Sequence, residues 1–86
     1  MNRGQILDEA KRLTLNEREA IYGTPLVNHQ RIAKFWSIYL EHEVTPQDVA
    51  LMMALVKVAR LIQTPDHLDS VIDLCSYGSI AGELAQ

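Results

Sequence analysis

The chain has 86 residues, 48% of them hydrophobic, and a formal net charge of −3 from 11 acidic and 8 basic residues. This length predicts a single domain over residues 1–86, and the negative charge excludes the basic surface typical of a nucleic-acid-binding protein. A single cysteine excludes an intrachain disulfide and a cysteine-ligated zinc site, and fits a reducing compartment. The N-terminal residues contain no apolar signal-peptide core, so we expect a cytoplasmic protein.

Small size and high hydrophobic content together favour self-association. A chain this short buries only roughly 60–65% of its unfolded surface, so a lone monomer is expected to be marginally stable. A hydrophobic fraction of 48% is high for so small a chain. We therefore expect a homo-oligomer whose subunits share apolar surface.

Hydrophobic spacing and helix-end signals predict a small all-α bundle of about four main helices. The predicted helical segments are 4–13, 16–22, 27–43, 46–63 and 65–84. Thr14 stands three residues before Glu17, the spacing of a capping box. Thr45-Pro46 and Thr64-Pro65 are both typical helix starts. Because the loops are short, neighbouring helices are expected to pack antiparallel.

The central segment, Val49–Ile62, is apolar except for Lys57 and Arg60. A helix that is apolar all round is expected to be buried on most sides, and this one is too short to span a bilayer. Lys57 and Arg60 are three residues apart and leave the helix on one edge. Because buried cations need anions beside them, another part of the chain or a ligand must supply negative charge.

The last helix carries Asp69 and Asp73 one turn apart, with Tyr77 one turn further on the same face. Two carboxylates at this spacing can hold Mg²⁺, a cation that also bridges to phosphates. The alternative is that they form salt bridges with Lys57 and Arg60, because a tight turn joins the two helices. The spacing alone leaves both interpretations open.

The turn Tyr22-Gly23-Thr24-Pro25 leads into the N-terminus of the helix that carries Asn28 and Trp36. A helix N-terminus presents free N–H groups to anions. Tyr22 or Trp36 would stack on a base, and Asn28 would contact a base edge or a phosphate. The alternative is a rigid turn with core aromatic residues.

Two further expectations concern helix faces. The apolar face of segment 27–43 is expected to contain Ile32, Phe35, Trp36, Tyr39 and Leu40, with His29 on the surface. Gly78 and Gly82, four residues apart, are expected to allow close approach of another helix.

Several short motifs occur in a fixed order over nearly the whole chain. They are Tyr22-Gly23-x-Pro25-x-x-Asn28, Ile32-Ala33-x-x-Trp36, Thr45-Pro46-x-Asp48-Val49-Ala50-x-Met52-Met53, Lys57-x-x-Arg60-Leu61 and Asp69-Ser70-x-x-Asp73-x-x-x-Tyr77. This set resembles a family of small helical phage and prophage proteins of unassigned function. That family is in turn similar to the all-α nucleotide pyrophosphohydrolases of the MazG type, and to a phage nucleotide-modification-associated family.

The resemblance implies a MazG-like oligomeric bundle that binds Mg²⁺ and acts on nucleotides. It implies that Asp69 and Asp73 are metal ligands and that Lys57 and Arg60 bind phosphate. The MazG type also carries an acidic cluster, E-E-x-x-E, on an earlier helix, and this chain has no acid along the corresponding inner face. Two carboxylates rarely suffice for a hydrolase that uses two metal ions.

The favoured hypothesis is therefore a phage-type protein that binds a small nucleotide without cleaving it. Such a protein would sequester a nucleotide or a nucleotide-derived defence signal in the host cytoplasm. The expected ligand-binding residues are Tyr22, Asn28, Trp36, Lys57, Arg60, Asp69, Asp73 and Tyr77. The first alternative is a Mg²⁺-dependent nucleoside triphosphate pyrophosphohydrolase. The second is a non-catalytic oligomeric adaptor whose charged rows are ion pairs only.

Overall fold

The computed structural model describes the backbone of residues 1–86 and the side chains of residues 1–15 and 19–86. The elements in chain order are α1 (Arg3–Arg12), a π-helical turn η1 (Leu13–Glu17), α2 (Arg18–Tyr22), α3 (Pro25–Leu40), α4 (Pro46–Gln63) and α5 (Leu68–Leu84). The described backbone contains four main helices and no strand, which confirms the all-α prediction. None of the described helices has both the length and the apolar character needed to cross a membrane.

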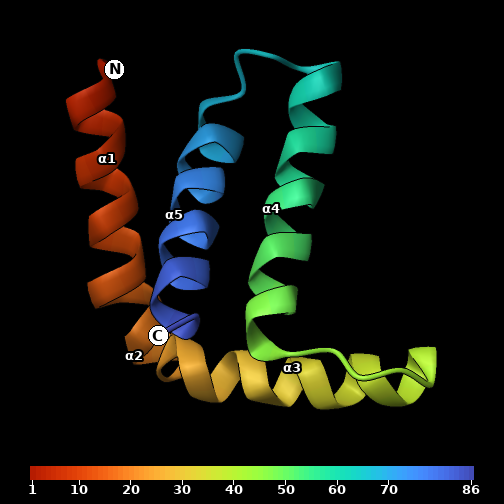
Figure 1. Cartoon of the computed structure of the whole chain (residues 1–86). Helices are drawn as coiled ribbons and strands as arrows, with labels where there is room; N and C mark the ends of the chain where they lie inside the picture. The colour runs from red at the N-terminus through yellow and green to blue at the C-terminus, as the bar shows by residue number, and fades with distance from the viewer.

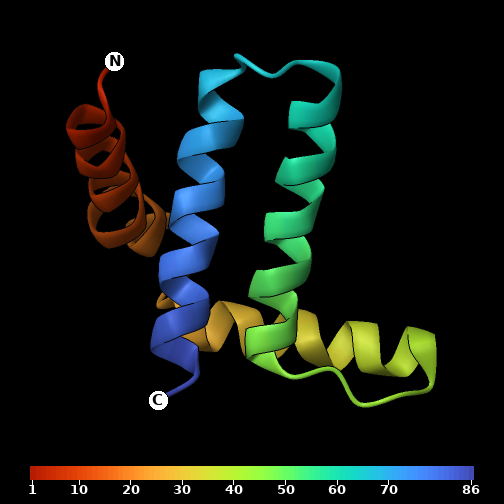
Figure 2. The ribbon, with the colours of Figure 1, turned by 45° about the horizontal axis from the view of Figure 1, so that its top comes forward.

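The helices α4 and α5 form an antiparallel hairpin that is the centre of the fold (Figure 1). Helix α1 packs on the side of α5 that faces away from α4, and α3 runs across one end of the hairpin (Figures 1 and 2). The expectation that neighbouring helices pack antiparallel therefore holds for α4 and α5 but is wrong for α3 and α4. The C-terminal part of α3 extends beyond α4, and the chain returns along the 41–45 segment before α4 begins (Figure 2).

Local capping interactions fix where the helices begin. At the start of α4, the hydroxyl oxygen of Thr45 accepts a hydrogen bond of 3.0 Å from the N–H of Asp48, and the Asp48 carboxylate accepts one of 2.9 Å from the N–H of Thr45. The second bond, from the N–H of Thr45, favours the ionised carboxylate and holds the pKa of Asp48 below its ordinary value. Helix α3 starts at Pro25 rather than residue 27, because Thr24 caps it through the N–H of Val27.

Two helix ends differ from the sequence-based expectation. Helix α3 stops at Leu40 rather than residue 43, because Glu41 adopts a left-handed conformation with φ of 52°. Helix α5 starts at Leu68 rather than Pro65, with His67 as its N-terminal flanking residue. The Nδ1 atom of His67 lies 2.7 Å from the hydroxyl oxygen of Ser70, which holds the first turn together.

The predicted new helix start at Thr14 is wrong. The chain instead continues from α1 through η1, and the buried Thr14 hydroxyl donates a hydrogen bond of 2.9 Å back to the carbonyl oxygen of Ala10. The side chain of Glu17, the expected partner in a capping box, lies outside the described residues. Ser and Thr hydroxyls often bond backward in this way within a helix, where they compete with a capping role.

The buried core is small and lies where α4 meets its two neighbours. One cluster contains Ala33, Val44 and Val49, with Ile32, Trp36 and Met53 packed against it. The other contains Ala50, Ile80 and Ala81, with Tyr77 and Leu84 packed against it. The two clusters use adjacent sides of α4, through Val49 and Ala50, and the outer side of that helix does not contribute to either cluster.

Several apolar residues that were expected inside are exposed. Phe35, Tyr39 and Leu40 are 72%, 86% and 51% exposed, although they were expected to share an apolar face with Trp36. The prediction that α4 is buried on most sides is also wrong, since Leu55 and Ile62 are 66% and 79% exposed. Within the chain, Gly78 and Gly82 do not approach another helix: a Cβ added at either would meet no atom within 4 Å.

Candidate functional site

A buried ion pair joins the two helices of the central hairpin. The ammonium nitrogen Nζ of Lys57 on α4 lies 3.0 Å from the carboxylate oxygen Oδ2 of Asp73 on α5. The two side chains are only 11% and 16% exposed. The sequence left open whether the chain or a ligand provides the negative charge beside Lys57. In the structure the chain provides it, through Asp73.

The other two charged residues of the predicted site lie apart from this pair. Arg60 is exposed, so the expectation that α4 buries two cations is wrong for this residue. Arg60 is turned about 60° around the helix from Lys57, and its side chain is exposed. Asp69 is also exposed, in the first turn of α5.

This arrangement bears on the predicted Mg²⁺ site at Asp69 and Asp73. A cation bound by both carboxylates would compete with the Lys57 ammonium for the oxygen atoms of Asp73. Among the side chains that the structure describes, no group of three or more His, Cys, Asp or Glu residues is placed to hold a metal ion.

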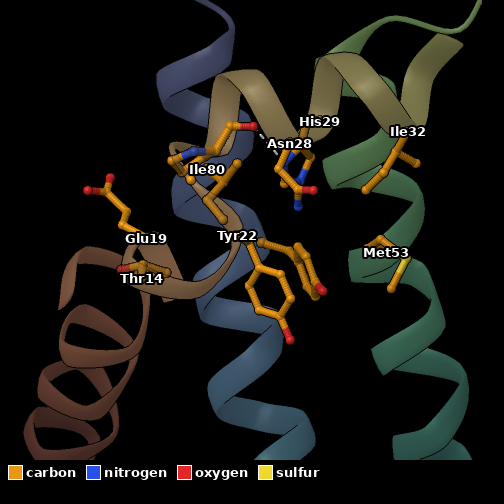
Figure 3. Close-up of a pocket in the computed structure, with 11 residues that line it drawn as sticks. Thr14, Glu19, Tyr22, Asn28, His29, Ile32, Met53 and Ile80 are labelled. Carbon is orange, nitrogen blue, oxygen red and sulfur yellow. Dashed lines mark hydrogen bonds between the residues drawn. The ribbon is translucent and has the colours of Figure 1, made fainter. Parts of the chain in front are cut away.

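A cavity of about 200 Å³ lies between the α1–α2 connection and helices α3, α4 and α5 (Figure 3). Its lining residues are Thr14, Glu19, Tyr22, Gly23, Pro25, Asn28, His29, Ile32, Met53, Tyr77 and Ile80. Three of the predicted ligand-binding residues, Tyr22, Asn28 and Tyr77, are therefore brought together here from three different helices. The close-up shows Tyr22 and Asn28 among the residues that line this cavity (Figure 3).

The turn between α2 and α3 places Tyr22 and Asn28 on the same cavity. Gly23 ends α2 with a φ of 79°, and its N–H donates a hydrogen bond of 3.0 Å to the carbonyl oxygen of Glu19. Glycine adopts this left-handed conformation without the steric cost that a Cβ would add. Pro25 then starts α3 directly, so that Asn28 lies in its first turns and is half-buried, while Tyr22 remains 56% exposed at the rim.

His29 is the main residue that sequence reasoning missed, because it was expected on the surface and is only 4% exposed. Its Nδ1 atom lies 2.8 Å from the carbonyl oxygen of Pro25, and this contact requires Nδ1 to carry the proton. The Nε2 atom is then a hydrogen-bond acceptor, and it is buried with no partner among the described residues. Burial lowers the pKa of His29 below its ordinary value and so favours the neutral ring.

A signal for this burial was present in the sequence. His29, Ala33 and Trp36 follow one another at spacings of four and three residues, which places His29 on the inner face of α3. The ring of His29 also makes an edge-to-face contact with Tyr77, with the ring centres 6.5 Å apart.

The cavity and the ion pair are neighbours along the α4–α5 hairpin. Met53, in the cavity wall, is one helical turn before Lys57, and Tyr77, also in the wall, is one turn after Asp73. Trp36, by contrast, does not line the cavity but packs against the Ala33, Val44 and Val49 cluster. Its predicted role as a stacking platform therefore has no geometric counterpart at this cavity.

Comparison with family models decides where the chain belongs. Residues 5–85 match the family described as "Domain of unknown function (DUF6378)". The chain is a member of the DUF6378 family. The match covers every main helix that forms the cavity and the ion pair, from most of α1 through α5.

Two curated relatives of this DUF6378 chain come from mycobacteriophages. It is 40% identical over 76 residues to the "Gene 55 protein" of Mycobacterium phage L5, covering 87% of this chain and 49% of the relative. It is 46% identical over 72 residues to the "Gene 55 protein" of Mycobacterium phage D29, covering 84% of this chain and 48% of the relative. These findings confirm the predicted resemblance to phage proteins of unassigned function.

The DUF6378 chain spans about half the length of the curated relatives it matches. No solved structure matches it.

Proposed function

We propose that this chain binds a small nucleotide without cleaving it, with the base held in the cavity lined by Tyr22, Asn28 and Tyr77. In a cell infected by a phage, such binding would sequester a nucleotide or a nucleotide-derived defence signal in the host cytoplasm. The supporting observation is that three helices bring two aromatic rings, an amide and a buried acceptor to one cavity. Each of these groups suits a nucleobase, which offers flat faces for stacking and polar edges for hydrogen bonding.

The size of the cavity fits part of a nucleotide. Pockets that enclose a whole drug-sized ligand usually measure roughly 300–1,000 Å³, whereas this one measures about 200 Å³. One ring system would fill it, and the sugar and phosphates would extend outward. The exposed position of Tyr22 at the rim suits a residue that closes over the base.

The unpartnered Nε2 atom of His29 gives the pocket a chemical preference. A buried acceptor without a hydrogen bond costs about 1–3 kcal/mol, and a donor on the ligand would recover that cost. The neutral imidazole accepts a hydrogen bond only from an N–H or O–H group. We therefore expect the bound base to carry a donor, such as an exocyclic amino group or a protonated ring nitrogen.

The surrounding charges favour binding over hydrolysis. The Asp73 carboxylate, which the MazG resemblance assigns to metal binding, already contacts the ammonium of Lys57. The chain also lacks the upstream acidic cluster of MazG-type enzymes. Phosphates outside the cavity would have to reach Lys57, one turn along the hairpin, or the exposed Arg60.

A depletion assay tests this proposal. The purified chain is incubated with a panel of nucleoside mono-, di- and triphosphates and cyclic dinucleotides, with and without Mg²⁺, and the filtrate is analysed by chromatography. We expect one class of nucleotide to be depleted and then released unchanged when the protein is denatured by heat. If no nucleotide in the panel is depleted or converted, the proposal is wrong.

A matched pair of variants locates the binding site. Removing one base–aromatic stack costs about 1–3 kcal/mol, so Tyr22→Ala should weaken binding by about 5- to 160-fold. Tyr39→Ala is the control, because Tyr39 is 86% exposed and does not line the cavity. Equal weakening by both variants would place the ligand elsewhere on the chain.

Two alternatives have their own outcomes in the same assay. A MazG-like pyrophosphohydrolase, the function that the resemblance implies, would convert a triphosphate to a monophosphate in the presence of Mg²⁺. A non-catalytic oligomeric adaptor would neither bind nor cleave any nucleotide. The adaptor is favoured by one observation, the direct pairing of Lys57 with Asp73, which leaves that cation already occupied.

A further inference from the structure

The chain exposes more surface than a folded protein of its mass normally does. A monomer of 9.7 kDa typically exposes about 5,100 Å², whereas this chain exposes 6088 Å². Its radius of gyration is 13.4 Å, against about 12 Å for a compact domain of this length. The excess of about 1,000 Å² is close to the roughly 800 Å² that each partner buries in a stable protein–protein interface.

Part of the exposed apolar surface lies on one face of α4. Leu51, Leu55, Val58 and Ile62 are 47%, 66%, 40% and 79% exposed. They are spaced by four, three and four residues, so they form one continuous stripe along the helix. We call these four residues the α4 stripe.

The α4 stripe lies opposite the face through which α4 contacts the rest of the chain. Val49, Ala50 and Lys57 are buried on that inner face, against α3 and α5. Helix α4 is the outermost member of the α1–α5–α4 layer, so no other helix of the chain covers its outer side (Figure 1). Lys57 and Arg60 lie off the stripe, whereas Asp48, three residues before Leu51, lies at the N-terminal end of the same face.

The spacing of the α4 stripe is the same when read in either direction. Its centre falls between Leu55 and Val58, and the intervals on the two sides are equal. A second α4 that runs antiparallel therefore presents a matching stripe in register, so that Leu51 meets Ile62 of the second copy and Leu55 meets Val58. Two-fold symmetric interfaces require this kind of self-complementary patch.

We propose that two copies of this chain form a two-fold symmetric dimer by pairing their α4 stripes antiparallel. Intervals of three and four residues are those of helices that pack with interdigitating side chains at a shallow crossing angle. Ala54 and Ala59 flank the stripe, and their small side chains let the two helix backbones come close. This dimer goes beyond the nucleotide proposal and does not depend on it.

Sedimentation velocity over a concentration series of the 86-residue chain tests the dimer. The native chain should sediment as a dimer at micromolar concentration. Leu55→Glu should raise the dissociation constant by at least about a hundredfold, because a carboxylate near the two-fold axis would be buried without a partner. Leu7→Glu is the matched control, because Leu7 is 59% exposed on α1, which lies on the far side of α5.

Circular dichroism shows whether Leu55→Glu remains folded, and the outcomes are then decisive. A helical, monomeric Leu55→Glu beside a dimeric Leu7→Glu supports the proposal. A native chain that stays monomeric at about 100 μM, well above the micromolar range of specific association, would overturn it. So would a dimer that Leu55→Glu leaves intact, because its interface would then lie elsewhere.

Cross-linking tests the antiparallel orientation separately, in a Cys75→Ser background. Leu51→Cys and Ile62→Cys chains should form a disulfide with each other when mixed and oxidised. Each chain alone should cross-link poorly, because the like positions lie at opposite ends of the paired helices. Efficient cross-linking of Leu51→Cys with itself would indicate a parallel pair and overturn this arrangement.

Discussion

Lys57 Nζ lies 3.0 Å from Asp73 Oδ2 across the interface between α4 and α5, and both side chains are nearly buried. The pair lies one helical turn from the cavity wall formed by Met53 and Tyr77. It therefore joins α4 and α5 beside the part of the hairpin that contributes Met53, Tyr77 and Ile80 to the cavity wall. Any substitution of Lys57 that is meant to probe a ligand will first act on the fold.

We predict that Lys57→Met lowers the free energy of unfolding by about 2–4 kcal/mol, because removing one partner of a buried pair leaves the other poorly compensated. Arg60→Met is the matched control, since the same change is made three residues away at an exposed position, where effects are usually within about 0.5 kcal/mol. Urea denaturation of both variants measures the difference. Equal stability of the two variants would show that the ion pair does not stabilise the hairpin.

The difference in burial between Lys57 and Arg60 also decides which of the two residues can be substituted to test ligand binding. Both Lys57 and Arg60 are expected to bind phosphate, but Lys57 is buried in an ion pair with Asp73. Only at the exposed Arg60 is an alanine substitution expected to leave the fold intact. We predict that Arg60→Ala has the same free energy of unfolding as the native chain. If Arg60 contacts phosphate, the variant should bind a nucleoside triphosphate about tenfold more weakly. Isothermal titration with the nucleotide found by depletion measures this, and unchanged affinity would remove Arg60 from the site.

Stability should fall in mild acid because of His29. Burial lowers the pKa of this histidine in the folded chain, while the unfolded chain titrates near the ordinary value of about 6.5. Between these two pKa values the unfolded state binds more protons, so the free energy of unfolding decreases as pH falls below about 6.5. The slope contributed by one histidine is at most about 1.4 kcal/mol per pH unit.

Urea denaturation between pH 5 and pH 8, the range in which an ordinary histidine titrates, checks this effect. His29→Asn should flatten the dependence, because asparagine keeps an N–H for the carbonyl oxygen of Pro25 but does not titrate. His42→Gln is the control at an exposed position. If His42→Gln flattens the curve and His29→Asn does not, the assignment to His29 is wrong.

Helix capping at Thr45 should contribute measurably to stability. Thr45→Ala removes the acceptor of a 3.0 Å hydrogen bond from the N–H of Asp48, and we expect a loss of about 1 kcal/mol. Thr24 caps α3 with a longer bond of 3.4 Å, so Thr24→Ala should cost less. Thermal denaturation compares the two, and the reverse order would contradict the geometric argument.

Local signals in the sequence were sufficient where neighbouring residues decide the structure. The Thr45-Pro46 start of α4 and the turn at Gly23 follow from capping and φ preferences that act within a few residues. The path of α3 across the end of the hairpin could not be predicted from such local signals, because it depends on the left-handed Glu41 and the return segment after it. Short loops alone do not distinguish a helix that crosses its neighbour from one that packs alongside it.

The candidate site was predictable only in part, for a similar reason. Tyr22, Asn28 and Tyr77 were chosen for their chemistry, and the structure brings all three to one cavity. His29 was missed because it lies near the charged residues Arg31 and Lys34 in the sequence, which suggested a surface position. Its spacing to Ala33 and Trp36 instead places it on the inner face of α3. The apolar residues on the outer face of α4 led to the prediction that this face is buried. It is exposed, because no other helix of the chain packs against it.

The glycines offer a final pair of predictions with opposite signs. Gly78 lies within α5, where alanine favours the helical backbone by about 0.5–1 kcal/mol over glycine, and an added Cβ would meet no atom within 4 Å. Gly78→Ala should therefore raise the free energy of unfolding by about that amount. Gly23 has equal space for a Cβ, but its φ of +79° is costly for alanine. Gly23→Ala should therefore lower the free energy of unfolding by about 1–2 kcal/mol. Urea denaturation distinguishes the two signs, and a loss of stability in Gly78→Ala would indicate that another surface, such as a second copy of the chain, packs closely against α5.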